Sequence, residues 1–155
     1  MNFLHERPGY HSPMTYIGAG ASPTVINKFN SGIEDAWSGP FGQYDVRTKV
    51  VEGYENTIYV PSITTERSFV YSDNDCSGAW DPVEEGWVAA HEAGHLMGLP
   101  DFYRDINGKS VPMPGHDKTI MGQYGGDITE DDITMILFYN ALSSTSSYPK
   151  IDPPF

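Results

Sequence analysis

The stretch His91–Asp101 constrains this chain most, because two histidines lie four residues apart and are followed by glycine, proline and aspartate. On a helix, residues at positions i and i+4 share one face, so His91 and His95 can direct both imidazoles at one metal ion. Gly98 is typical of a helix end, after which the chain can return Asp101 as a third ligand. Three protein ligands and an open fourth position are typical of catalytic zinc, whereas structural zinc sites are closed.

Glu92 directly follows the first of these histidines. A carboxylate at this position can reach a water molecule on the metal and take its proton, which is general-base chemistry. Zinc lowers the pKa of its bound water from ~16 towards ~7, which makes attack on a peptide carbonyl feasible at neutral pH. The residues therefore predict metal-assisted hydrolysis, with one zinc ion as cofactor and Glu92 as the general base.

Length and charge narrow the classes of partner. A chain of 155 residues fits one domain with its own core, so we expect a single domain over residues 1–155 and a monomer. The formal net charge of −12 would repel nucleic acid and anionic membrane surfaces. No apolar run approaches the ~20 residues of a membrane span. We therefore expect a protein or peptide partner, and neither nucleic acid nor a membrane.

The N-terminal residues bear on localisation. Residues 1–20 contain no basic segment followed by an apolar core, so the sequence predicts no signal peptide. Either the protein stays inside the cell, or it is a segment of a longer exported chain. We expect the second: a protein that is secreted, or delivered by a secretion system.

Hydrophobic periodicity predicts an α+β fold with a small mixed sheet. A helix should begin with Ser22 as its N-cap, because apolar residues then recur at spacings of three and four. The alternating residues Tyr44–Val51 predict a strand, and Thr57–Val60 and Ser68–Tyr71 predict two shorter ones. Residues 1–21 are expected to form an extended lead-in with at most one short strand.

Two further helices are expected. Asp81 as N-cap, Pro82 at the first helical position and Glu84 closing a capping box predict that the histidine-bearing helix runs from Pro82 to Met97. A last helix should begin at Thr129, because acidic residues follow it where negative charge suits the positive end of a helix. We expect an irregular tail over residues 143–155.

The pattern HExxHxxGxxD in His91–Asp101 resembles the motif of the metzincin zinc peptidases, whose usual third ligand is histidine. Aspartate at this place is similar to the motif of the small bacterial snapalysin peptidases. The Gly-Leu-Pro-Asp run is also similar to that of immune inhibitor A-type peptidases. The resemblance covers eleven contiguous residues, and it implies a helix, a twisted sheet, the zinc helix and a final helix, in that order.

The resemblance also implies a methionine-bearing turn beneath the metal. Ile120-Met121-Gly122 is similar to that Met-turn, with Met121 as an apolar floor and not a ligand. In some metzincins a tyrosine shortly after the methionine stabilises the transition state, so Tyr124 is a candidate for this role. Its offset from Met121 is three residues where two is more familiar, and a packed aromatic residue is the alternative.

Two alternatives concern metal ligands. The loop that follows Asp101 is long and should shape the substrate site, and it could instead bring His116 or Asp117 to the metal as third ligand. The spaced carboxylates of Ser72–Gly78 could bind Ca²⁺, although the segment lacks the full EF-hand pattern.

These residues favour a zinc-dependent endopeptidase as the function, as a bacterial toxin or effector module of a longer secreted chain. We expect its peptide substrate to bind extended along an edge strand near Ser68–Tyr71, through main-chain hydrogen bonds. A toxin would add a cognate inhibitor or immunity protein to the partners. The alternatives are a zinc-binding interaction module without catalysis and an amidase that acts on cell-wall peptides.

Overall fold

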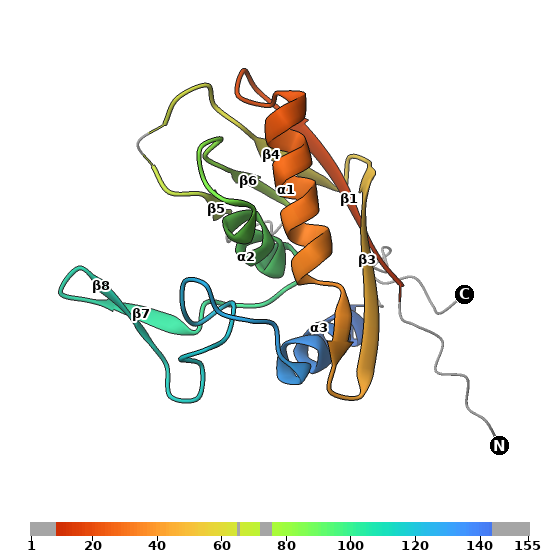
Figure 1. Cartoon of the computed structure of the whole chain (residues 1–155), viewed down its shortest axis with the longest axis vertical. Coiled ribbons are helices and arrows are strands. Elements are labelled where there is room, and N and C mark those ends of the chain that lie inside the picture. The colour runs from red at the N-terminus through yellow and green to blue at the C-terminus, as the bar shows by residue number, and fades with distance from the viewer. Residues whose placement is uncertain (1–8, 65, 72–75, 144–155) are drawn as a thin grey trace.

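A six-stranded mixed sheet organises the chain, and the computed structural model describes residues 9–64, 66–71 and 76–143 of it. Figure 1 shows helices α1 and α2 side by side on one face of this sheet, which gives an α+β domain. The elements of the described part are β1 (Gly9–Ile17), α1 (Pro23–Ala36), β2 (Gly39–Phe41), β3 (Tyr44–Glu52), β4 (Asn56–Tyr59), β5 (Phe69–Val70), β6 (Ser77–Ala79), α2 (Gly86–Leu96), β7 (Tyr103–Ile106), β8 (Lys109–Pro112) and α3 (Glu130–Ser143).

The strands follow the order β2-β3-β1-β4-β6-β5. The four inner strands are parallel, whereas β2 and β5 at the two edges are antiparallel to their neighbours. The predicted strands β3 and β4 are confirmed to within one residue at each end. The prediction for Ser68–Tyr71 is confirmed as a shorter edge strand, β5.

Strand β1 corrects the expectation of an extended lead-in over residues 1–21, because it pairs with β3 and β4 inside the sheet. Tyr10, Ser12 and Met14 alternate into the core and are at most 7% exposed. The polar Ser12 and the neighbouring Pro13 hide this period in the sequence. Pairing with β4 begins only at Met14, so Pro13, which has no N–H group, pairs on the β3 side alone.

Helix α1 confirms its prediction. The Ser22 side chain caps its first turn by accepting a hydrogen bond from the backbone N–H three residues later, and Phe29 and Ile33 bury its apolar stripe. Trp37 follows the helix and is 1% exposed. Its indole N–H donates to the carbonyl oxygen of Ala90 at 2.9 Å, which joins the end of α1 to the middle of α2.

Helix α2 begins at Gly86, so the predicted start at Pro82 is wrong. The reason is that the residues of the expected capping box are engaged elsewhere. The Asp81 carboxylate accepts from a backbone N–H in a turn before the helix. The Glu84 carboxylate accepts from the hydroxyl of Ser68, next to edge strand β5.

Helix α3 begins one residue after the predicted Thr129. The backbone N–H of Asp132 donates to the Thr129 hydroxyl, and the Asp132 carboxylate accepts from the Thr129 N–H at 2.8 Å. These two bonds form a capping box. Burial of Asp132 raises the pKa of its carboxyl group. The predicted irregular tail lies, apart from residue 143, outside the described residues, and no helix of the described part is long and apolar enough to cross a membrane.

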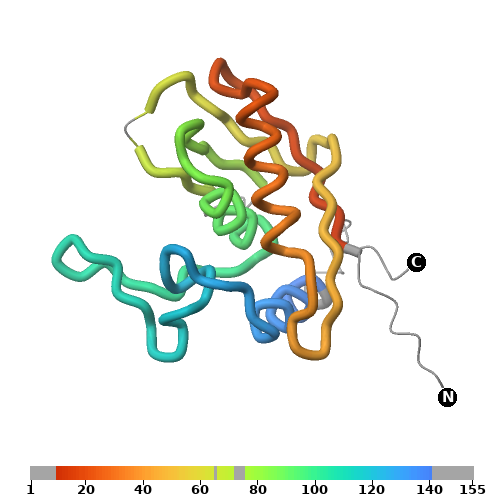
Figure 2. Tube along the Cα trace, viewed as in Figure 1, coloured from red at the N-terminus to blue at the C-terminus, as the bar shows by residue number. Residues whose placement is uncertain are grey.

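The loop expected after Asp101 contains a β-hairpin that the sequence analysis missed. Strands β7 and β8 pair antiparallel and are joined by Asn107 and Gly108, both at positive φ of 52° and 74°. An Asn-Gly pair favours this type of two-residue turn. Figure 2 shows that the hairpin extends away from the helices and the large sheet.

Candidate metal centre

Helix α2 presents three aromatic side chains on one face, as its sequence spacing predicts. The rings of Trp87 and His91 stack with centroids 5.6 Å apart, and those of His91 and His95 lie edge to face at 5.0 Å. The small residues of the helix, Ala89, Ala90, Ala93 and Gly94, are buried. At Gly94, an added Cβ would lie 2.6 Å from the sulfur of Met121, so this position has no room for a side chain without a shift of Met121.

Backbone carbonyl groups orient both imidazoles. The Nδ1 atom of His91 lies 2.9 Å from the carbonyl oxygen of Ile120, and that of His95 lies 2.8 Å from the carbonyl oxygen of Leu99. A carbonyl oxygen can only accept, so each Nδ1 carries a proton and donates it. In the neutral imidazole, the lone pair is then on Nε2, which is the usual arrangement of a metal-binding histidine.

Asp101 returns to both histidines, as predicted. Gly98 ends the helix with φ at +104°, a conformation that L side chains rarely adopt. One oxygen of Asp101 then lies 3.4 Å from Nε2 of His91 and 3.3 Å from Nε2 of His95. Burial alone would raise the pKa of the Asp101 carboxyl group, but the two histidines beside it outweigh this effect and lower it. For His95, burial opposes protonation, but Asp101 and the Leu99 carbonyl raise its pKa.

The geometry of these three groups fits zinc. Ligand atoms at ~2.0–2.1 Å from a tetrahedral zinc ion are separated from one another by about 3.3 Å, close to the separations observed here. A hydrogen-bonded ion pair would be shorter, at about 2.8 Å. Moreover, two neutral imidazoles would direct only lone pairs at the Asp101 carboxylate, an arrangement that a cation between them stabilises.

The alternative ligands lie elsewhere. Among the described residues, His91, His95 and Asp101 form the one group of three whose ligand atoms come within 4.8 Å of one another. His116 instead stacks on Phe102 with ring centroids 4.0 Å apart. For the calcium prediction on Ser72–Gly78, residues 72–75 lie outside the described residues.

Glu92 lies beside the three ligands and is 5% exposed. Its Oε2 atom is buried and has no hydrogen-bond partner in the described structure. Burial raises the pKa of its carboxyl group, although the two histidines partly offset this effect. A buried carboxylate with a free oxygen is a stronger base than an exposed one, as a general base requires.

Met121 lies beneath α2, where the resemblance places the floor of the metal site. Its side chain is 0% exposed and contacts Gly94. The preceding carbonyl group, that of Ile120, is the acceptor for His91, and the carbonyl oxygen of Met121 accepts from the N–H of Phe102 at 2.8 Å. The turn therefore supports both the helix and the segment that follows Asp101.

Tyr124 lies further from the ligands and is 66% exposed. Its hydroxyl donates to the Glu85 carboxylate at 2.8 Å, and its ring packs on Trp87 with centroids 4.9 Å apart. In this structure the Tyr124 hydroxyl is therefore bonded to Glu85 and not directed at the candidate ligands. Its role in the transition state stays a prediction.

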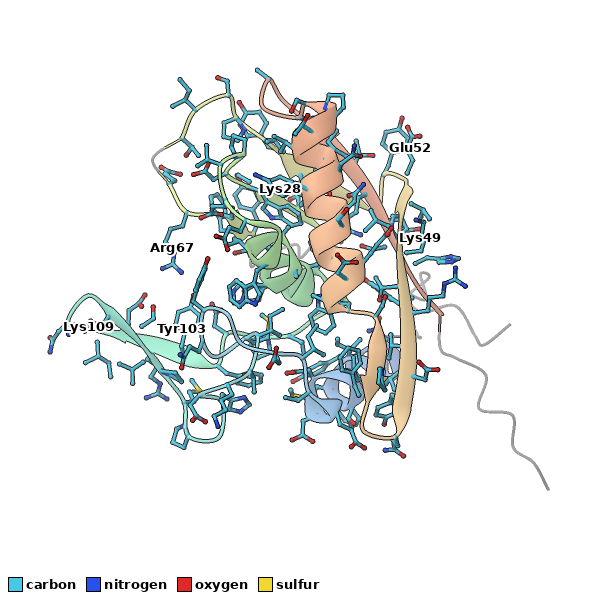
Figure 3. The ribbon with its side chains drawn as sticks, in the orientation of Figure 1. Lys28, Lys49, Glu52, Arg67, Tyr103 and Lys109 are labelled. Carbon is cyan, nitrogen blue, oxygen red and sulfur yellow. The ribbon has the colours of Figure 1, made fainter. Side chains whose placement is uncertain are left out.

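Tyr103 belongs to the loop that was expected to shape the substrate site, whereas Arg67 was not predicted, and the two residues face each other in Figure 3. The Arg67 guanidinium donates to the Tyr103 hydroxyl at 3.5 Å. Burial and the charge of Asp101 raise the pKa of Tyr103, and the pKa of Arg67 is raised by Tyr103. Tyr103 could have been found from its place two residues after Asp101, whereas no local pattern marks Arg67.

Two cavities flank the histidines and together form a cleft. One has a volume of about 780 Å³ and extends along β5 to Pro100, and the other has a volume of about 440 Å³ and extends past Trp87 to Tyr124. The residues that line both cavities mark the middle of the cleft, and they are Arg67, Ser68, His91, Glu92 and Tyr103.

Comparisons with known proteins give no information on function. No family model and no curated protein matches the chain. Among 23 matching chains of solved structures is one described as "Structure of a chaperone-substrate complex", with 11% identity and a TM-score of 0.41. The match covers 86% of this chain and 35% of that one, so the chain spans about a third of its length. A likeness this weak supports no statement about function.

Proposed function

We propose that this chain is a zinc-dependent endopeptidase. The observation that carries the proposal is the convergence of His91, His95 and Asp101 next to a buried carboxylate, Glu92, in the middle of a cleft. The donor set, its separations and the orientation of both imidazoles fit zinc. The metzincin-like motif supports the same function.

The residues divide the work of peptide hydrolysis between them. His91, His95 and Asp101 would hold the ion, which when bound polarises a peptide carbonyl and makes water more acidic. Glu92 takes the proton of the attacking water and delivers it to the leaving amine. Because Asp101 carries a negative charge where a metzincin usually has a neutral histidine, it should lower the net charge of the centre.

The shape of the cleft favours a polypeptide substrate. Cavities extend to both sides of Glu92, so a chain can continue in both directions from the bond that is cleaved. Edge strand β5 lines the larger cavity, and an extended peptide can pair with such an edge through main-chain hydrogen bonds. These features support cleavage within a chain rather than removal of a terminal residue.

The test is hydrolysis of casein and of a peptide library by zinc-loaded protein, with and without a chelator. Glu92→Gln keeps the shape of the side chain but removes the base, so we expect the rate to fall by about 10²–10⁴-fold while zinc still binds at one equivalent. Substitution of exposed Glu55, outside the cleft, is the matched control.

The outcome separates the alternatives. One equivalent of bound zinc without chelator-sensitive cleavage of any peptide would support a non-catalytic zinc-binding module instead. Cleavage of cell-wall peptides but not of casein would support the amidase.

A further inference from the structure

The smaller cavity has a fixed aromatic wall. The indole N–H of Trp87 donates to the carbonyl oxygen of Gly126 at 3.0 Å, and its ring packs between those of His91 and Tyr124. Tyr103 lines the same cavity. A long side chain that enters it therefore meets the rings of Trp87, Tyr103 and Tyr124.

The lining of the same cavity includes a carboxylate, that of Glu84. This carboxylate accepts a hydrogen bond from the neutral hydroxyl of Ser68. Within residues 9–64, 66–71 and 76–143, no lysine or arginine forms an ion pair with Glu84. The next residue, Glu85, adds a second carboxylate that accepts from the Tyr124 hydroxyl at the cavity wall. Negative charge and aromatic faces therefore occur together.

Arg67 is the one cation that opposes this charge among the residues that line the cavity. It lies at the border of the two cavities, where its guanidinium donates to Tyr103. Tyr103 chiefly raises the pKa of Arg67, against its burial, and the charges of Asp105 and Glu92 contribute in the same direction as Tyr103. Negative charge therefore lies close to Arg67, whereas no lysine or arginine of the described residues pairs with Glu84.

We propose that this cavity binds a lysine or arginine side chain of the substrate, next to the bond that is cleaved. This inference rests on the proposed function. The apolar stem of such a side chain packs on the aromatic wall, its cation interacts with the faces of those rings, and its charge is paired by Glu84. The net charge of −12 would also attract a cationic segment.

The first experiment compares peptides that differ at one position adjacent to the cleaved bond. Zinc-loaded protein is given peptides with lysine, arginine, norleucine or glutamate there, and mass spectrometry of the products identifies the cleaved bond. We expect kcat/KM for lysine to exceed that for norleucine by about tenfold. A wild-type ratio at or below one on both sides of the bond would overturn the proposal.

Two substitutions locate the preference. Glu84→Gln should lower the ratio of lysine to norleucine to about one, and Glu84→Lys should make glutamate the better residue. Glu55→Gln changes a carboxylate outside the cleft and should keep the wild-type ratio. A preference for lysine that survives in both Glu84 variants, or that is also lost in Glu55→Gln, would contradict the assignment to this cavity.

A binding measurement separates this proposal from the peptidase itself. Calorimetry with zinc-loaded Glu92→Gln protein should show that the lysine peptide binds about tenfold more tightly than the norleucine peptide. If wild-type protein cleaves nothing but this difference is found, the peptidase proposal fails and the cavity assignment stands. Equal binding of the two peptides, together with cleavage that ignores lysine, would refute the cavity assignment alone.

Discussion

Helix α2 and hairpin β7–β8 both line the candidate cleft, but they are held in different ways. The helix buries Ala89, Ala90 and Ala93 at no more than 2% exposure. The hairpin leaves Ile106 and Val111 at 51% and 42% exposure. The candidate metal ligands therefore come from the buried helix and from the turn that ends it. The hairpin supplies the more exposed wall of the cleft.

The link between the hairpin and the opposite rim is weak. Arg67 reaches Tyr103 with a hydrogen bond of 3.5 Å, at the long limit for such a bond. The difference between the two walls teaches that one cleft can combine a buried candidate metal centre with a more exposed and less constrained wall.

The largest expected effect is on the free energy of unfolding, when the packing of helix α2 is disrupted. Trp37→Ala removes a ring that is 1% exposed and the hydrogen bond to Ala90, so the free energy of unfolding should fall by about 3–5 kcal/mol. Denaturant unfolding measures it. Trp37→Phe keeps an aromatic ring but loses the hydrogen bond and part of the buried volume, so it should cost less than Trp37→Ala, about 1–3 kcal/mol. Val111→Ala on the hairpin should change stability by no more than about 0.5 kcal/mol, and a similar loss at Trp37 and Val111 would remove the contrast.

Zinc should increase the difference in stability between helix α2 and hairpin β7–β8. An ion that binds only the folded state adds about 2.7 kcal/mol of stability at a free concentration of 100 times Kd. Thermal unfolding should therefore shift upward with zinc, and hydrogen exchange should slow in His91–Asp101 more than in β7–β8. A chelator should reverse both changes. Equal protection of the hairpin would show that the two walls respond as one unit.

The smallest expected effect concerns the link itself. Arg67→Met removes the hydrogen bond to Tyr103 and should change the free energy of unfolding by no more than about 0.5 kcal/mol, because the arginine is exposed. Amide exchange in β7–β8 should nevertheless become faster, whereas that in α2 should not change. Arg67→Lys, which keeps the cation, is the matched control. Unchanged exchange in the hairpin would mean that Arg67 does not restrain it.

Local patterns predicted the parts of the fold that depend on neighbours in sequence. Ser22 marked the start of α1, alternation marked β3, and the spacing of His91 and His95 marked their common face of α2. The return of Asp101 was predictable because Gly98 lies between it and the helix.

Features that depend on distant partners were not predictable. Glu84 has the sequence context of a helix cap, but its carboxylate accepts a hydrogen bond from the Ser68 hydroxyl instead. Pro13 obscures strand β1 in the sequence. A proline is compatible with this central strand only because it pairs with β3 and not with β4, and the sequence does not show this pairing. Arg67 joins the cleft because the tertiary fold brings its loop opposite Tyr103.

The acceptors that orient the two imidazoles are main-chain atoms, the carbonyl oxygens of Ile120 and Leu99. No substitution of a side chain at these two positions deletes the acceptor. A scan that truncates side chains one by one would therefore leave both acceptors of the candidate metal centre in place. The positions of these acceptors change only when the backbone moves, for example through the volume of residue 121 beneath the helix.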